Sequence, residues 1–236
     1  MLEYWAATDA AFHSPSTVVT NLVIAMQAFV LAFRLLQRAR TDVVRLWLLF
    51  FVFMALAALT GAVKHGEIVS RPAVWYLAVI ASNTFTVMAA AFAELATVRT
   101  LIGRGRGRWL LECAILAQIV VVFLISVFRP DFLPAFLATV AGLTPVMFIE
   151  WRESRCGRTG ASPIARGFGL TAIGGFAYAM RITLAPWVTY IDIAHLFTVA
   201  SLALIYRGVL ERASAELEPA EEPADSGDRG WSWLRA

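Results

Sequence analysis

The 236-residue chain is 59% hydrophobic, and its formal net charge at pH 7 is only +3. A soluble domain is about 45–50% apolar, so this composition indicates a polytopic membrane protein and excludes an ordinary water-soluble domain. The basic residues lie between the apolar runs, where membrane topology requires them, and we therefore expect no nucleic-acid function.

Apolar runs separated by short polar segments organise the chain. A helix needs about 20 apolar residues to cross the hydrocarbon of a bilayer, and the sequence contains seven runs of about this length. We therefore predict an all-α fold, with a seven-helix transmembrane domain over residues 17–212. The helices are expected at about residues 18–36, 46–65, 74–98, 109–128, 133–151, 167–185 and 190–207.

Two flanking segments differ from this domain. Residues 1–16 mix aromatic and acidic side chains, which suits the membrane interface, and we expect a short surface helix there. They lack a basic region followed by an apolar core, so no cleavable signal peptide is predicted. Residues 213–236 are acidic and contain prolines, so we expect a disordered cytoplasmic tail.

Arginine is distributed unequally between alternate connections. The segments after the first, third and fifth predicted helices, together with the end of the seventh, contain Arg34, Arg38, Arg40, Arg45, Arg99, Arg104, Arg106, Arg108, Arg152, Arg155, Arg158, Arg166, Arg207 and Arg212. The opposite side has only Lys64, Arg71, Arg129 and Arg181. Because positive residues accumulate on the cytoplasmic side, we predict an outside N-terminus and a cytoplasmic C-terminus in a bacterial-type inner membrane. Anionic membrane lipids are expected partners of the glycine- and arginine-rich loop at residues 103–108.

All three histidines fall on the predicted outer side. His13 precedes the first helix, His65 ends the second, and His195 lies about one turn inside the last. Asp192 and His195 are three residues apart and so share one helix face. An ionisable residue inside a membrane helix marks either a functional site or a structural pair.

These residues allow two interpretations. A catalytic zinc site typically has three protein ligands and a water, and His65, His195 and Asp192 could supply the three. Two further residues could replace one of them: His13 and Glu67. In the alternative, Asp192 neutralises Arg181 on the neighbouring helix and His65 caps a helix at the interface, since structural ion pairs use the same residue types.

Other features of the helices carry weaker predictions. Glu94, Glu112 and Glu150 lie toward the cytoplasmic ends, and we expect them to pair with loop arginines. The predicted sixth helix is rich in glycine and alanine, which lets neighbouring helices approach closely. Cys113 and Cys156 lie near cytoplasmic loops, where thiols stay reduced, so neither a disulfide nor a cysteine metal site is expected.

The positions of the two membrane histidines resemble those of the CREST superfamily, which includes the alkaline ceramidases and the progestin and adipoQ receptors. Its members show Ser-x-x-x-His at the end of helix 2 and His-x-x-x-His in helix 7, and three histidines hold zinc. The segment GAVKHG at residues 61–66 is similar to the first motif and DIAHLF at residues 192–197 to the second, within a resemblance that covers about residues 46–207. The zinc motif is incomplete, because only His65 and His195 match its histidines.

The resemblance implies a membrane hydrolase that uses a metal-activated water to attack a lipid amide or ester bond. His65 and His195 would bind zinc, and the catalytic Asp192 would ligate the metal or orient its ligands. Lys64 or Arg181 would hold an anionic group. The competing interpretation is a non-catalytic membrane subunit, or a scaffold that binds a lipid or another ligand, with a membrane-protein partner. In that case the same residues form a buried ion-pair network.

Overall fold

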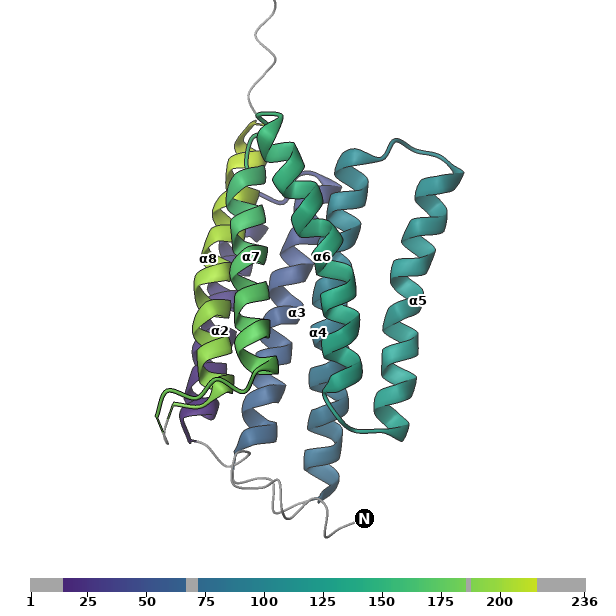
Figure 1. The fold of residues 1–236 in the computed structure, drawn as a ribbon. Coiled ribbons are helices and arrows are strands. Elements are labelled where there is room, and N and C mark those ends of the chain that lie inside the picture. The colour runs from purple at the N-terminus through teal and green to yellow at the C-terminus, as the bar shows by residue number, and fades with distance from the viewer. Residues whose placement is uncertain (1–14, 67–71, 186–187, 216–236) are drawn as a thin grey trace, which may run out of the picture.

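A computed structural model describes residues 15–66, 72–185 and 188–215, and within them it shows seven α-helices packed into one bundle (Figure 1). The helices are α2 (Pro15–Leu36), α3 (Asp42–His65), α4 (Pro72–Leu101), α5 (Arg106–Phe128), α6 (Leu133–Arg155), α7 (Ala161–Ala179) and α8 (Tyr190–Ala215). The predicted all-α fold is confirmed. The predicted interfacial segment and the predicted tail lie almost wholly outside the described residues.

Six of these seven helices are long and apolar enough to cross a membrane, namely all except α7. Helix α7 has 19 residues, and its glycines and Arg166 make it less apolar than the other six helices. The described part of the chain is therefore a helical bundle of the membrane type.

The helix bounds differ most from prediction at α7, which was expected at residues 167–185. The helix starts six residues earlier, directly after Gly160, whose φ of 76° is a left-handed conformation that glycine adopts without steric cost. It also ends earlier, because the chain turns at Met180 rather than at the proline of residue 186. The predicted basic loop before this helix is thus partly helical.

Arginine-rich segments extend other helices beyond their apolar runs. Helix α8 continues to Ala215, past the predicted end at Arg207, so residues 213–215, which were predicted to belong to the tail, are helical. Helix α5 begins at Arg106 and α6 continues to Arg155. Long arginine stems allow this, because they cover apolar surface while the guanidinium group reaches water.

The two ends of the bundle differ in charge. Successive helices run in opposite directions, so the connections α2–α3, α4–α5 and α6–α7 lie together at one end (Figure 1). We call it the arginine end, because these connections contain most of the arginines. The opposite end, where α3 finishes at His65 and α8 starts, is called the histidine end.

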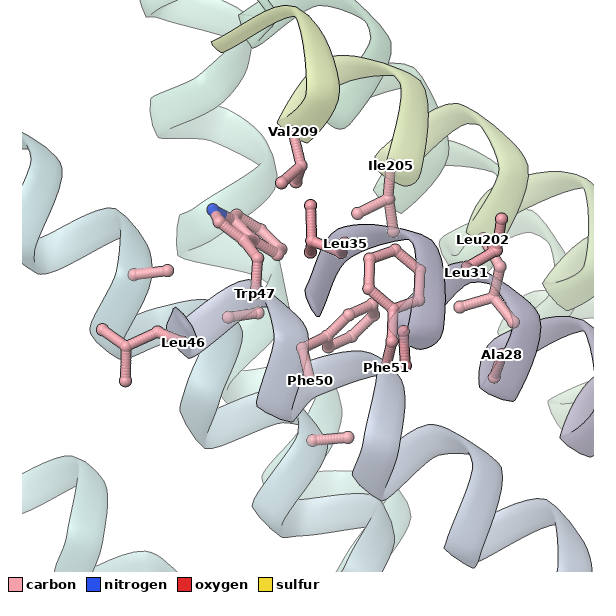
Figure 2. Close-up of a cluster of buried hydrophobic side chains, with 14 of the residues drawn as sticks. Ala28, Leu31, Leu35, Leu46, Trp47, Phe50, Phe51, Leu202, Ile205 and Val209 are labelled. Carbon is pink, nitrogen blue, oxygen red and sulfur yellow. The ribbon is translucent and has the colours of Figure 1, made fainter. Parts of the chain in front are cut away.

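The aromatic core fills the half of the bundle nearer the arginine end. Trp47 and Phe51 of α3 are fully buried, and they pack with Leu35 of α2 and with Ile205 and Val209 of α8 (Figure 2). Large side chains therefore fill the space between α2, α3 and α8 in this half.

Helices α7 and α8 pack at backbone distance. A Cβ atom on Gly208 would lie 2.4 Å from the carbonyl oxygen of Gly160. A Cβ atom on Gly167 or Gly174 would lie 3.0 Å or 3.2 Å from a carbonyl oxygen of α8. Small residues permit this approach between membrane helices, so the predicted role of the glycines is confirmed.

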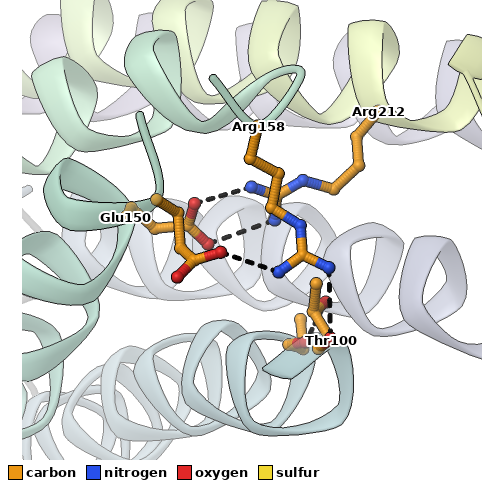
Figure 3. Close-up of polar contacts among 6 residues, drawn as sticks. Thr100, Glu150, Arg158 and Arg212 are labelled. Carbon is orange, nitrogen blue, oxygen red and sulfur yellow. Dashed lines mark hydrogen bonds and ion pairs between the residues drawn. The ribbon is translucent and has the colours of Figure 1, made fainter. Parts of the chain in front are cut away.

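One ion pair joins α6 to α8 inside the bundle. Arg212 donates from Nη1 to Glu150 Oε1 at 3.1 Å and from Nη2 to Glu150 Oε2 at 2.6 Å (Figure 3). Glu150 is 1% exposed and Arg212 is 6% exposed. Two parallel hydrogen bonds suit a buried pair, because a charge left alone there would be strongly destabilising. The prediction that Glu150 pairs with an arginine is confirmed.

A second ion pair fastens the turn between α6 and α7. Arg158 donates to Glu153 at 2.9 Å and to the backbone carbonyl of Thr100 on α4 at 3.4 Å (Figure 3). This turn is thereby held against the arginine end of α4.

Gly208→Ala tests the close contact between α7 and α8. The added methyl group collides with a backbone carbonyl that cannot rotate away, so we expect the free energy of unfolding to fall by about 1–3 kcal/mol. Unfolding in detergent micelles measures the loss. Gly169→Ala on α7 is the matched control, because no atom lies within 4 Å of its added Cβ. An equal loss in both variants would contradict the contact.

Candidate functional site

The histidine half of the bundle contains a cavity of about 850 Å³, here called the central cavity. Its floor is formed by Phe50 of α3, Met147 of α6 and Phe168 of α7, which border the aromatic core. Lys64 and Arg181 line it at the histidine end. Phe50 and Lys64 are fourteen positions apart on α3, so the residues that line the cavity span about 21 Å along the helix axis.

Side-chain size explains why this half is hollow. The first part of α3 contributes the large rings of Trp47, Phe50 and Phe51, whereas its second part presents Ala58 and Gly61 to the cavity. The other walls are mostly apolar, with scattered hydroxyl groups. The sequence of α3 therefore changes from core-filling to cavity-lining at about its midpoint.

Lys64 is a buried cation on the cavity wall. Its side chain is 9% exposed, and Nζ lies 5.6 Å from the centroid of the Phe132 ring. Within the described ranges the ammonium group makes no hydrogen bond and no ion pair. An aromatic ring compensates only part of the cost of burying an ammonium group. An anion entering the cavity would complete its environment.

Arg181 lies at the end of α7 in a backbone conformation that normally favours glycine. The Ile182 N–H donates to Ala177 O at 3.0 Å and the Arg181 N–H donates to Tyr178 O at 3.1 Å, which is the Schellman pattern of a helix C-terminus. Its φ is 51°, a left-handed value that costs an L-residue roughly 1–2 kcal/mol. Arginine thus occupies a strained position at the edge of the cavity.

The structure brings both membrane histidines to the wall of the same cavity. His65 and His195 line it together with Lys64 and Arg181. His195 Nδ1 lies 2.7 Å from the hydroxyl oxygen of Thr20 on α2, within hydrogen-bonding distance. This contact fixes the ring against α2 and leaves Nε2 as the nitrogen that α2 does not engage.

Asp192 has a structural role at the start of α8. Its Oδ2 accepts hydrogen bonds from the Thr189 N–H at 2.9 Å, from the Thr189 hydroxyl at 3.0 Å and from the Ser16 hydroxyl at 3.0 Å, while Oδ1 accepts one from Thr17 at 3.0 Å. The bond back to the Thr189 N–H is half of a capping box, and the others tie α8 to α2. Asp192 is not among the residues that line the cavity.

The suggestion that Asp192 neutralises Arg181 is wrong for the described residues. No ion pair joins the two side chains there, and the four donors around Asp192 are hydroxyl and amide groups. An acceptor with four neutral donors needs no arginine partner.

The described residues supply only part of the predicted zinc site. Among them, no three His, Cys, Asp or Glu side chains come together as a metal site would require. His65 and His195 could offer two nitrogen ligands, whereas a catalytic zinc typically needs three protein ligands. The candidate replacements, His13 and Glu67, lie outside the described residues.

The central cavity opens sideways between α6 and α7. Among the described residues that line it, those with exposed side chains come from these two helices or the turn after α7: Leu133, Val140, Thr144, Ala172, Phe176, Ala179 and Arg181. Figure 1 shows α6 and α7 meeting near the arginine end and diverging toward the histidine end. The cavity therefore opens to the outside of the bundle through its side.

Sequence reasoning missed the α5–α6 turn as part of the site. Asp131 and Phe132 line the cavity from this turn, which Tyr76 and Asn83 of α4 hold in place. The Tyr76 hydroxyl donates to Val127 O, and Asn83 Nδ2 donates to Asp131 O at 2.7 Å. No spacing rule predicts these contacts, because they join segments about 50 residues apart.

Arg181→Gly separates the strain at this position from its charge. Glycine adopts the left-handed conformation freely, so we expect Arg181→Gly to be more stable than Arg181→Ala by about 1 kcal/mol, although both lose the cation. Thermal unfolding of the two variants in detergent measures the difference. Equal stability would mean that residue 181 is not left-handed in solution.

Comparison of the chain with curated proteins and with solved structures finds no match in either set. One protein-family model does match, over residues 16–214, a region that contains nearly all of the helical bundle. The matched region also includes every residue placed at the central cavity above. The chain therefore belongs to DUF6962, a family of unknown function.

Proposed function

We propose that this protein is a membrane scaffold whose central cavity binds an anionic amphiphile, with the apolar chain inside the cavity and the charged head beside Lys64. The observation that carries the proposal is a buried ammonium group, without an ion pair among the described residues, on the wall of a largely apolar cavity of about 850 Å³. Ligand pockets typically measure about 300–1,000 Å³ and combine apolar walls with a few polar groups.

The proposal includes an orientation in the membrane. All seven helices cross a bacterial-type inner membrane, with the arginine end in the cytoplasm and the histidine end outside. The excess of arginine in three connections at one end supports this orientation through the positive-inside rule. The less apolar α7 crosses beside α8, whose backbone it contacts.

The sideways opening supports an amphiphile over a water-soluble ligand. Exposed apolar residues such as Leu133, Val140 and Phe176 flank it. In a bilayer these side chains face lipid, so a molecule with an apolar chain can enter from the membrane without crossing water. A small polar solute gains nothing from such an entrance.

A zinc-dependent lipid hydrolase of the CREST type is the second candidate. The observation in its favour is that His65 and His195 line the same cavity. We rank it second because the described residues supply no third metal ligand. Stoichiometric zinc that disappears in a His65→Ala, His195→Ala double variant, together with turnover of the bound lipid, would reverse this order.

Ala172→Trp tests whether the cavity holds the ligand. Ala172 lines the cavity from α7, so we expect an indole there to occupy the space and to abolish retention of an added long-chain fatty acid or anionic phospholipid. Native mass spectrometry of the purified protein detects the bound molecule. Ile173→Trp is the matched control, because Ile173 is exposed and does not line the cavity. Retention by Ala172→Trp at the level of the control would contradict the proposed binding site.

Lys64→Met tests the site of the charged head. Methionine keeps an unbranched apolar stem but removes the charge, so we expect affinity for the anionic amphiphile to fall about tenfold, or ~1.4 kcal/mol. Binding of a neutral monoacylglycerol should not change. Arg129→Met is the control, because Arg129 is an exposed cation near the same end and lies outside the cavity lining. An equal loss for the neutral ligand would indicate a packing defect rather than loss of a charge contact.

A further inference from the structure

Glu94 is a partly buried acidic residue of α4 that contacts two neighbouring helices, α5 and α6. From α5, Gln118 Nε2 donates a hydrogen bond to Glu94 Oε1 at 2.8 Å. From α6, the backbone of Gly142 approaches so closely that a Cβ atom there would lie 1.9 Å from the same oxygen. The carboxyl group of Glu94 therefore occupies the space that a side chain at residue 142 would fill.

No cation of the described residues neutralises Glu94, so the prediction that it pairs with a loop arginine is wrong. Lys64 and His65 belong to the histidine end of α3. Near the arginine end, the acidic groups of α3, α5 and α6 already have arginine partners: Asp42 with Arg45, Glu112 with Arg99 and Arg108, Glu150 with Arg212, and Glu153 with Arg158. Glu94 is left with one amide donor and no opposite charge.

On α4, Glu94 lies between residues that line two different pockets. One turn before it on α4, Ala90 lines the central cavity. One turn after it, Thr97 lines a second pocket of about 290 Å³, which Arg152 and Glu153 border at the arginine end. Residues 90, 94 and 97 lie on one face of α4, because they are four and three residues apart. The hydroxyl of Thr97 is buried and has no hydrogen-bond partner in the described chain.

We propose that Glu94 is a proton-binding site, whose carboxyl group holds a proton in the barrier between the central cavity and the pocket at Thr97. An unpaired carboxylate among apolar helices is costly, and a bound proton removes the charge. A metal cation does not fit, because Mg²⁺ and Ca²⁺ require about six or more oxygen ligands. Only one carboxyl group and one amide meet here.

Protonation of Glu94 is coupled to the wall of the central cavity. Loss of the proton places a negative charge directly against the backbone of Gly142, and the next residue, Leu143, lines the cavity. The coupling arises from packing alone and needs no amphiphile. The proton site therefore stands independently of the ligand proposed for the cavity.

A hydrophobic carbodiimide tests the proposal on the full-length protein in liposomes. A protonated carboxyl group gives its proton to one nitrogen of dicyclohexylcarbodiimide, and its oxygen adds to the central carbon. The adduct rearranges to an N-acylurea that retains the whole reagent, with no leaving group. Peptide mass spectrometry then locates the modified residue.

We expect the adduct on Glu94 and expect it to diminish as the pH is raised. The adduct should be lost in Glu94→Gln and retained in Glu112→Gln, which removes an acid that is already paired with arginine. Labelling of wild-type protein that misses Glu94, or that does not change with pH, would overturn the proposal. The wild-type result decides even if a variant fails to fold.

Infrared spectroscopy supplies a readout without a reagent. The difference between the spectra of wild type and Glu94→Gln should contain the C=O stretching band of a protonated carboxylic acid. Gln118→Leu should shift this band, because it removes the hydrogen bond to Glu94 Oε1. A difference spectrum with carboxylate bands only would overturn the proposal.

Discussion

Polar groups in a bundle of apolar helices must find their partners inside the protein, because the surroundings offer none. Under this constraint, charged residues that have partners differ from those that lack them. Asp192 has four donors, and Glu150 and Arg212 form two hydrogen bonds with each other. Lys64 and Glu94 are less exposed than the loop arginines, yet neither has an opposite charge among the described residues. Lys64 lines the central cavity, and Glu94 contacts Gly142, whose neighbour Leu143 lines it, so both unpaired ionisable groups lie at or next to the cavity.

The difference between the aromatic core and the central cavity arises from residue size. Large rings on α3 meet α2 and α8 near the arginine end, whereas alanine and glycine replace them along the cavity. Glycines also bring α7 and α8 into backbone contact, which fixes one wall of the cavity while α6 diverges from α7 (Figure 1). Packing thus creates the space, and the polar residues then give that space its chemical character.

The sequence predicted the approximate positions of the seven helices in the described residues and the separation of charge between the two ends, because hydropathy and arginine placement are local properties. It also predicted that Lys64, His65, Arg181 and His195 share one end. The role of Asp192 was missed, because its partners on α2 lie about 175 residues away. We expected Glu94 to pair with an arginine because both lie toward the cytoplasmic ends of the helices. Pairing also depends on which helix faces meet, and tertiary packing determines that. The start of α7 depended on the left-handed Gly160, which apolar periodicity does not reveal.

The most direct test of the central claim is a crystal structure of the protein grown in a lipidic mesophase doped with an anionic lipid. The account predicts electron density for an apolar chain in the central cavity, with the charged head within about 4 Å of Lys64 Nζ, the usual limit for an ion pair. A cavity without such density, in which a carboxylate of the protein itself pairs with Lys64, would contradict it.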